Sequence, residues 1–430
     1  MMRVLLLSHT TGYQLRAFND AAAELGIQLL FATDRCHMLD DPWQDHAVAV
    51  RFHDLERSVE AIRRTAEDAP IAGVIAVGDR PVVLAAHAAA ALGLPWHSID
   101  GAVASADKRR SRAALAMAGL PSPNHVVVRV GSAHADLPRD GGVEYPCVLK
   151  PIGLSGSRGV IRADSPAEFA AAFGRIRALL ARPQVRSARA GLEDEILVES
   201  FIPGREYAIE AVATHGRLTV FAIFDKPDPL DGPFFEETIY VTPSRASRAV
   251  QRAIVSTVER AVDALGLQHG PVHAECRVGD DGRVFVLEVA ARPIGGLCSR
   301  VLRFGGPERT APRDRGWSLE HVLLEHALQR PIDGYERERD AAAVMMIPIP
   351  ARGLLKGIAG EEDARAVPGV DEVRITAKRD QLLEPLPEAG SYLGFIFARG
   401  TTPRDAEHAV RAAHACLRLD IASPIPITAR

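Results

Sequence analysis

The sequence predicts a protein of mixed α/β and α+β class, with a doubly wound α/β domain at its N-terminus and a β-rich region at its C-terminus. In the first hundred residues, short apolar runs alternate with segments of helical periodicity, as in a parallel sheet covered by helices. Later strands follow one another around glycine-containing turns. The 430 residues are 47% hydrophobic and 25% charged, which allows two or three globular domains.

The first domain is predicted to alternate strictly between strands and helices. The uninterrupted apolar run at residues 4–7 is typical of a strand whose two faces are both covered. Ligands of such sheets bind beyond the carboxyl ends of the strands, so residues 8–12 and 78–80 are candidate ligand loops. No GxGxxG follows the first strand, which argues against a dinucleotide site. The predicted strands are 4–7, 27–32 and 71–77, and the predicted helices are 16–25, 59–65 and 82–92.

A glycine-rich loop follows the next strong strand signal. A helix is predicted from Ser105 to Met117, with a domain boundary near residue 103, and a strand is predicted at 145–151. The loop at 153–159 contains three glycines and two serines, so its backbone N–H groups can surround phosphate oxygens. It is not a Walker A loop, because Lys150 precedes the glycines instead of following them.

A β-hairpin is predicted over residues 273–292, around the turn at 279–282. If the turn is centred between residues 280 and 281, Glu275 lies opposite Val286, and Glu275 and Glu288 share one face of the hairpin. Two neighbouring carboxylates repel each other unless a cation lies between them, and Mg²⁺ is the usual cation. The alternative is a solvated pair, because exposed hairpins often carry Glu on the face toward water.

The remaining segments alternate between strands, helices and one long connection. Residues 225–244 are rich in Pro and Gly and are expected to be irregular, and a long connection of this kind is often functional. The further predicted strands are 195–202, 207–213, 218–224, 341–349, a strand within 369–378, and 391–398. The further predicted helices are 164–181, 247–265, 318–328 and 403–417.

Composition excludes several classes of protein. The net charge is -4 and no long block of Lys and Arg occurs, so nucleic-acid binding is not indicated. The five cysteines are scattered without a CxxC motif, which favours a reducing compartment over a disulfide framework or a zinc site. No signal peptide or membrane span is expected, and the sequence therefore predicts a cytoplasmic protein.

Five motifs, in this order, resemble those of the ATP-grasp superfamily, and most closely the L-amino acid (dipeptide) ligase branch of its carboxylate–amine ligases. They are Asp107-Lys108; Leu149-Lys150-Pro151 with 153–160; Glu199-Ser-Phe-Ile-Pro-Gly-Arg-Glu206; His273-Ala-Glu275; and Leu287-Glu288-Val-Ala-Ala-Arg292 with Gly295-Gly296. The resemblance implies a pre-ATP-grasp α/β domain (1–103), a small lobe (104–198), a large lobe (199–335) and a C-terminal α+β extension of the large lobe (336–430).

The resemblance also implies a role for each motif residue. The residues implied for the nucleotide are Lys108 and Lys150 for the ATP phosphates, Gly153, Ser155, Gly156, Ser157 and Gly159 in the mobile loop, Glu199, Phe201 and Ile202 for the adenine, and Glu206 for the ribose. The residues implied for metal and substrate are Glu275 and Glu288 for Mg²⁺ (or Mn²⁺), Arg292 and Lys150 for catalysis, and Arg292, Glu237, Gly295 and Gly296 for substrate.

The implied activity is an ATP- and Mg²⁺-dependent ligation. A carboxylate, expected to be that of an amino acid, is phosphorylated to an acyl phosphate and coupled to an amine, which gives an amide or dipeptide, ADP and phosphate. The implied partners are these two small molecules, and a homodimer is common in the family.

Two positions depart from the family pattern. Ala290 stands where many members have Asn, and Tyr240 stands where the dipeptide ligases have His, three residues after Glu237. The alternatives are a reaction like that of glycinamide ribonucleotide synthetase or biotin carboxylase, or a non-catalytic ATP-binding module.

Overall fold

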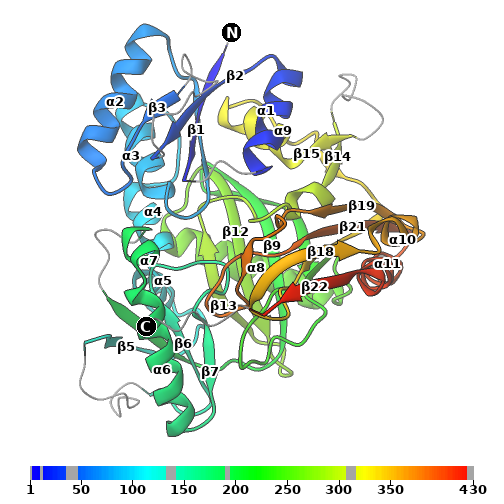
Figure 1. Ribbon diagram of the computed structural model, residues 1–430. Helices are drawn as coiled ribbons and strands as arrows, with labels where there is room; N and C mark the ends of the chain where they lie inside the picture. The colour runs from blue at the N-terminus through cyan, green and yellow to red at the C-terminus, as the bar shows by residue number, and fades with distance from the viewer. Residues whose placement is uncertain are drawn as a thin grey trace, which may run out of the picture.

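The computed structural model describes residues 2–9, 13–34, 47–131, 142–188, 194–306 and 316–423. Residues 10–12 of the predicted ligand loop at 8–12 lie outside the described residues. Figure 1 shows the N-terminal domain (blue) above a central sheet (green), with a small lobe (teal) on one side and the C-terminal strands (orange to red) on the other. Among the described helices, none has the length and apolar character needed to cross a membrane.

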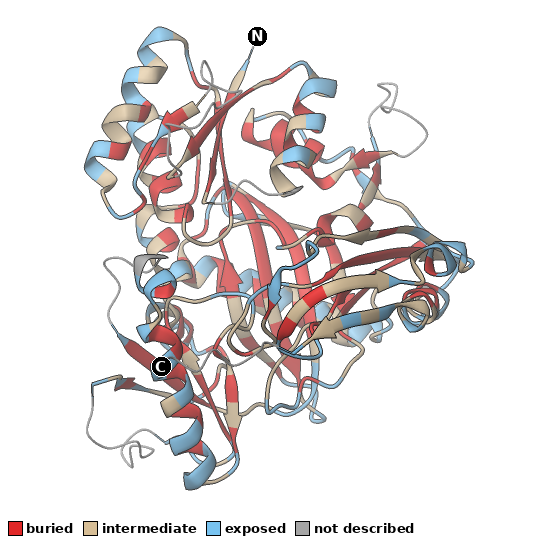
Figure 2. Cartoon of the chain, in the orientation of Figure 1, coloured by how far each residue is buried: buried red, intermediate tan, exposed pale blue. Residues whose placement is uncertain are grey.

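The N-terminal domain has the predicted doubly wound architecture. Its parallel sheet has the strand order β3-β2-β1-β4. The residues of β1 and β4 are almost completely buried because helices cover both faces (Figure 2). The predicted helix 82–92 is confirmed with the same limits. The strands are β1 (Arg3–Ser8), β2 (Gln28–Thr33), β3 (Ala47–Ala49) and β4 (Gly73–Val77), and the helices are α1 (Tyr13–Leu25), α2 (Leu55–Asp68), α3 (Val82–Leu92) and α4 (Ile99–Ala106).

The predicted helix starting at Ser105 is wrong at its start. Ser105 belongs to α4, and Asp107 then adopts an extended conformation (φ -115°, ψ 110°) before α5 (Lys108–Met117). The Asp107 carboxylate accepts a hydrogen bond from the backbone N–H of Arg109 at 2.9 Å and so acts as the N-cap of α5. The cap places Lys108 at the first position of that helix.

The small lobe is an antiparallel sheet of order β5-β8-β6-β7, covered by α6. Its helix buries Phe169, Phe173 and Ile176, the residues that share one face at helical spacing. The expected domain limit at residue 198 falls inside β8, and we therefore propose that this lobe extends to Ser200. Its elements are β5 (His125–Arg129), β6 (Cys147–Pro151), β7 (Ile161–Ala163), β8 (Glu195–Ser200), α6 (Pro166–Ala181) and α7 (Pro183–Ala188).

One eight-stranded sheet contains both the large lobe and the C-terminal region, in the order β13-β12-β9-β10-β11-β17-β21-β19. Residues 239–242, which were expected to be irregular, form the strand β11 that joins the two halves through β17. Each residue of β11 is buried, because it lies between two strands inside the sheet. The strands are β9 (Arg205–Thr214), β10 (Arg217–Asp225), β11 (Ile239–Thr242), β12 (Gly270–Val278), β13 (Val284–Ala290), β17 (Ala341–Ile347), β19 (Val370–Ile375) and β21 (Gly394–Gly400).

Helices and two small sheets surround the central sheet. The helix α8 packs with α4 and α5 of the preceding domains, and α11 packs on β17 and β21. The helices are α8 (Arg248–Leu265), α9 (Leu319–Ala327), α10 (Glu361–Ala366), α11 (Pro403–Cys416) and the 3-10 turn η2 (Cys298–Val301). The remaining strands are β14 (Arg303–Gly305), β15 (Trp317–Ser318), β16 (Glu336–Arg337), β18 (Gly353–Ala359), β20 (Leu382–Leu383) and β22 (Arg418–Ala422).

The hairpin β12–β13 is present, but its predicted register is wrong. Glu275 lies directly opposite Glu288, and Val286 lies opposite Cys276 on the apolar face. The register shifts between Glu275 and Cys276, so Leu287 is an extra residue in β13. This bulge and a longer turn than predicted each move the pairing by one residue. The two shifts together keep both carboxylates on one face and bring them into direct opposition.

Candidate functional site

A cavity of about 640 Å³ lies where the N-terminal domain, the small lobe and the central sheet meet. Asp79 lines it from the loop after β4, Lys150 from β6 and Glu275 from β12. Every site residue predicted from the sequence lines this cavity except Gly153 and Gly159. The structure therefore brings together residues that are up to 188 positions apart in the chain, from Lys108 to Gly296.

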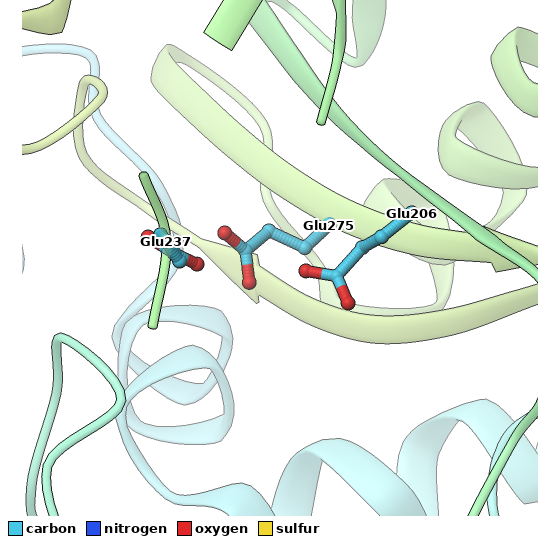
Figure 3. Close-up of side chains that lie close together, drawn as sticks. All are labelled: Glu206, Glu237 and Glu275. Atoms are coloured by element: carbon cyan, nitrogen blue, oxygen red, sulfur yellow. The ribbon is translucent and has the colours of Figure 1, made fainter. Parts of the chain in front are cut away.

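Glu206, Glu237 and Glu275 form a row of carboxylates whose oxygens lie within 4.8 Å of one another. Figure 3 shows Glu275 between the other two side chains. The ammonium group of Lys226 bonds to all three, with its Nζ 2.8 Å from Glu206, 2.8 Å from Glu237 and 2.7 Å from Glu275. The Lys226 side chain is only 2% exposed, so it acts as a buried counterion behind the carboxylates.

The pKa values of Glu237 and Glu275 are shifted in opposite directions. Burial raises the pKa of Glu237 to about 7, and the neighbouring Glu275 adds to the rise while Lys226 opposes it. Burial also acts to raise the pKa of Glu275, but Lys226 and His273 outweigh it and hold that pKa well below its usual range. Glu275 is therefore charged near neutral pH, whereas Glu237 takes up a proton more readily.

The second buried charge network lies on the small-lobe side of the cavity. Lys150 Nζ lies 2.5 Å from the Glu199 carboxylate, and Arg112 Nε donates to the same carboxylate at 2.6 Å. Burial alone would raise the pKa of Glu199, but Arg112 and Lys150 lower it to about 2. Lys108 reaches the glycine-rich loop, where its Nζ donates to the backbone oxygen of Leu154 at 2.9 Å.

Arg292 is held in place by an acid of the N-terminal domain. Its Nε donates to the Asp79 carboxylate at 2.7 Å, which raises the pKa of the guanidinium further. Beneath it, His273 Nδ1 lies 3.1 Å from the Glu210 carboxylate, and Glu210 also accepts hydrogen bonds from the backbone N–H of Ile294. The segment that contains Gly295 and Gly296 is thereby fixed to the central sheet.

The nucleotide residues expected on the inter-lobe segment lie beside a buried arginine. Arg277 Nη1 donates to the Ile202 carbonyl at 2.8 Å, and its Nε donates to Glu206 at 3.0 Å. Its guanidinium also lies 5.2 Å from the ring centre of Phe201. Both oxygens of Glu206 are thus engaged by cations, and its role toward a ribose stays a prediction.

The opposite end of the cavity is mostly apolar. Cys298 and Met346 line it and touch through their sulfur atoms at 3.9 Å. Tyr240 and Tyr392 line it as well, and the Tyr240 hydroxyl donates to Glu237 at 2.8 Å. Burial raises the pKa of the Tyr392 hydroxyl well above its usual value, and the charge of Glu237 adds to this rise. This end therefore offers an uncharged wall next to the Glu237 carboxylate.

Gly159 of the predicted loop serves the shape of the loop. A side chain at Gly159 would meet Pro151 Cγ at 2.7 Å, and its φ of +75° is a conformation that only glycine adopts readily. Gly159 does not line the cavity, and neither does Gly153.

Sequence reasoning missed Lys226, Arg112 and Arg277, but it did predict a ligand loop at 78–80, and Gly78 and Asp79 of that loop line the cavity. Lys226 lies beside Glu206 because a bulge between Val220 and Ala222 shifts the pairing of β10 with β9 by one residue. Arg112 contacts Glu199 and Leu287, and Asp79 contacts Arg292, and no local pattern reveals these long-range partners.

The donor set fits a hard divalent cation. Glu275 and Glu288 face each other across the hairpin, and carboxylate oxygens are preferred ligands of Mg²⁺. The buried ammonium of Lys226 shows independently that this side of the cavity favours positive charge. Ala290 lies opposite His273 in the same hairpin and offers no ligand atom.

Three protein families match the chain in succession. Residues 19–96 match the ATP-grasp N-terminal domain, residues 143–301 match the ATP-grasp domain, and residues 345–422 match the L-amino acid ligase C-terminal domain 2. The matches follow the order of the N-terminal domain, the two lobes and the C-terminal strands described above.

Individual proteins show the same likeness. The chain is 28% identical to the alanine–anticapsin ligase of Bacillus amyloliquefaciens over 254 residues, which are 56% of this chain and 52% of that protein. It is 31% identical to a D-alanine–D-alanine ligase of Gloeobacter violaceus over 255 residues, which are 56% of this chain and 75% of that protein. The chain spans about half the length of the alanine–anticapsin ligases that it matches. A crystal structure of an L-amino acid ligase from Bacillus licheniformis superimposes with a TM-score of 0.79 at 26% identity and covers 98% of this chain and 99% of that one.

Proposed function

Because the chain belongs to the ATP-grasp ligases and carries an L-amino acid ligase C-terminal domain, we propose that it activates the carboxylate of an amino acid with ATP and couples it to an amine. The γ-phosphoryl group of ATP passes to the carboxylate oxygen, which releases ADP and forms an acyl phosphate. The amine attacks the acyl carbon, loses a proton, and phosphate leaves as the amide forms. The products are an amide or dipeptide, ADP and phosphate.

The observation that carries this proposal is the gathering of two lysines and two hairpin carboxylates around one cavity. Lys108 and Lys150 line it from α5 and β6, and Glu275 and Glu288 line it from the β12–β13 hairpin. Phosphoryl transfer depends mainly on positioning and charge neutralisation, and such an arrangement supplies both. Bound Mg²⁺ would be held by Glu275 and Glu288 and would neutralise charge on the phosphates.

The chain's own residues would bind and orient the two organic substrates. The guanidinium of Arg292 is held by Asp79 and presents its remaining N–H groups to a carboxylate or an acyl phosphate. Glu237 would pair with a substrate ammonium group, next to the hydroxyl of Tyr240. The uncharged wall of Cys298, Met346 and Tyr392 would then contact the amino-acid side chain, which favours an apolar side chain over a charged one.

The test is phosphate release from ATP and Mg²⁺, screened against pooled amino acids and amines. We expect release that depends on an amino acid, together with an amide product detected by mass spectrometry. Release that requires bicarbonate or a ribosylamine would instead support a carboxylase or a ribonucleotide synthetase. ATP binding without release in any pool would support a binding module.

A substitution of one metal glutamate tests the site itself. Glu288→Gln removes a ligand charge but keeps the side-chain shape, so we expect turnover to fall by about 10²-fold or more with an unchanged unfolding midpoint. Full activity in this variant would contradict the metal assignment.

A further inference from the structure

The segment from Glu384 to Tyr392 connects β20 to β21 in the C-terminal region, yet it contacts the glycine-rich loop of the small lobe. The backbone N–H of Gly159 donates to the Pro387 carbonyl at 2.8 Å. The next contact is made by Arg158, whose Nε donates to the Glu388 carbonyl at 2.8 Å. The end of the loop is thus bonded to a part of the chain more than 220 residues later.

Two ion pairs extend this contact from the loop to the helix α6. The Glu388 carboxylate binds Arg175 with both of its oxygens, and Arg175 Nη2 lies 2.8 Å from one of them. Bidentate pairs of this kind fix orientation as well as distance. The Glu384 carboxylate lies 2.7 Å from Arg182 Nη1, directly after the end of α6. The pKa of Glu388 is lowered, because Arg175 outweighs the effect of burial.

The second half of the same segment lines the cavity. Gly390, Ser391 and Tyr392 are all cavity residues, and a side chain at Gly390 would lie 3.7 Å from Arg158 Cδ. Ser157 of the loop lines the same cavity. One short segment therefore contacts the loop on one side and the apolar, substrate end of the cavity on the other.

We propose that residues 384–392 are a latch that holds the small lobe closed over the cavity, with Glu384 and Glu388 as its positioning residues. This proposal rests on the function proposed above in one respect, because closure matters chemically only if a water-sensitive acyl phosphate is formed. With the latch intact, the amine attacks the acyl carbon and phosphate leaves. When the latch opens, water attacks instead, the free carboxylate is regenerated, and ATP is hydrolysed to ADP and phosphate without amide.

The experiment compares the double variant E384Q/E388Q with the matched control Glu361→Gln. Glu361 pairs with Arg365 within α10 of the same C-terminal region. Among the described residues, this pair makes no hydrogen bond to the small lobe. The first measurement is amide hydrogen exchange of residues 153–160 without substrates. We expect exchange about tenfold faster in the double variant and unchanged in the control, since each half-exposed ion pair shifts an equilibrium by up to about fivefold.

The second measurement is the ratio of phosphate released to amide formed. For the wild type and the control we expect nearly equal amounts of phosphate and amide. For E384Q/E388Q we expect more phosphate than amide. Raising the salt concentration should increase the ratio in the wild type but not in the double variant, whose pairs are already absent. A merely structural role of the glutamates would not give this salt dependence.

The results separate the latch from the proposed function. If the wild type forms no amide with any amino acid, the function proposal fails, and the exchange measurement still decides the latch. Unchanged exchange at 153–160 in E384Q/E388Q overturns the latch, whatever the enzyme catalyses. The charge-swapped variant Arg175→Glu/Glu388→Arg restores an ion pair between positions 175 and 388. If this pair is responsible, amide exchange at 153–160 should be slower in the swapped variant than in E384Q/E388Q and close to the wild-type rate.

Discussion

At Lys226, a single buried ammonium group binds three carboxylates that come from two strands and a connecting segment. A charge in this position is stable only because each of its hydrogen-bond donors has an acceptor. Its removal would leave Glu206, Glu237 and Glu275 to repel one another across short distances. The residue therefore sets both the local stability and the affinity of the cavity for external cations.

The variant Lys226→Met tests this balance. We expect the unfolding temperature to fall at pH 7 without Mg²⁺, and we expect added Mg²⁺ to raise it more than in the wild type, because the divalent ion replaces the lost charge. Thermal unfolding with and without Mg²⁺ measures both effects. The control is Lys356→Met, which removes an exposed lysine paired with Asp380 at 2.7 Å. Equal Mg²⁺ shifts in wild type and Lys226→Met would contradict the counterion role.

The apolar wall of the cavity gives a second prediction at this scale. Met346→Lys places a charge beside Cys298 and Tyr392, so we expect the KM for an amino acid with an apolar side chain to rise by about tenfold or more while the KM for ATP stays unchanged. Steady-state kinetics with each substrate varied in turn measure the two constants. A parallel rise in both would indicate a general loss of structure.

Among the elements, the β12–β13 hairpin shows what sequence patterns reveal and what they miss. Alternation and turn chemistry predicted the hairpin and the shared face of Glu275 and Glu288, because these depend on local residues. The bulge at Leu287 has no local signal. Its carbonyl accepts a hydrogen bond at 2.6 Å from Arg112 of α5, and this partner is far away in the sequence. The strand β11 was missed for the same reason, since its pairing with β17 is a long-range contact.

The helix α5 therefore links the two lobes through Arg112, whose side chain is 1% exposed. Arg112→Met should lower the free energy of unfolding by about 3–5 kcal/mol, because Glu199 is left buried with one cation fewer. Urea unfolding measures the loss. The matched control is Arg110→Met on the exposed side of the same helix, for which we expect little change. A loss equal to that of the control would show that Arg112 adds nothing to stability.

At the scale of the whole molecule, the interface between the N-terminal domain and the central sheet contains a group of histidines. His269 stacks on His326 with ring centres 4.2 Å apart, and His97 Nε2 lies 3.0 Å from the Pro271 carbonyl. Burial lowers the pKa of His97 and His269 to about 4 and that of His326 to about 3. All three are therefore neutral in the folded protein at neutral pH.

This group predicts loss of stability in acid. Each folded-state pKa lies below the unfolded value of about 6.5, so the unfolded chain takes up protons first as the pH falls from about 6.5 toward 4, and the free energy of unfolding decreases. In His97→Asn, the slope of stability against pH near pH 5 should be smaller by about 1.4 kcal/mol per pH unit, which corresponds to one proton. Urea unfolding between pH 5 and 7 measures the slope. An unchanged slope would contradict the assignment of His97 as a neutral buried group.

The continuous sheet through β11 and β17 has a practical consequence for protein engineering. The C-terminal region matches its own family over residues 345–422, which suggests a module that can be exchanged between relatives. The pairing of β11 with β17 contradicts that view, because a chain cut before Ala341 would leave β11, whose residues are all buried in the intact sheet, as an exposed edge strand. Such a truncated chain is expected to aggregate. Chimeras with altered substrate range should therefore exchange individual cavity residues, or the whole half of the sheet together with β11.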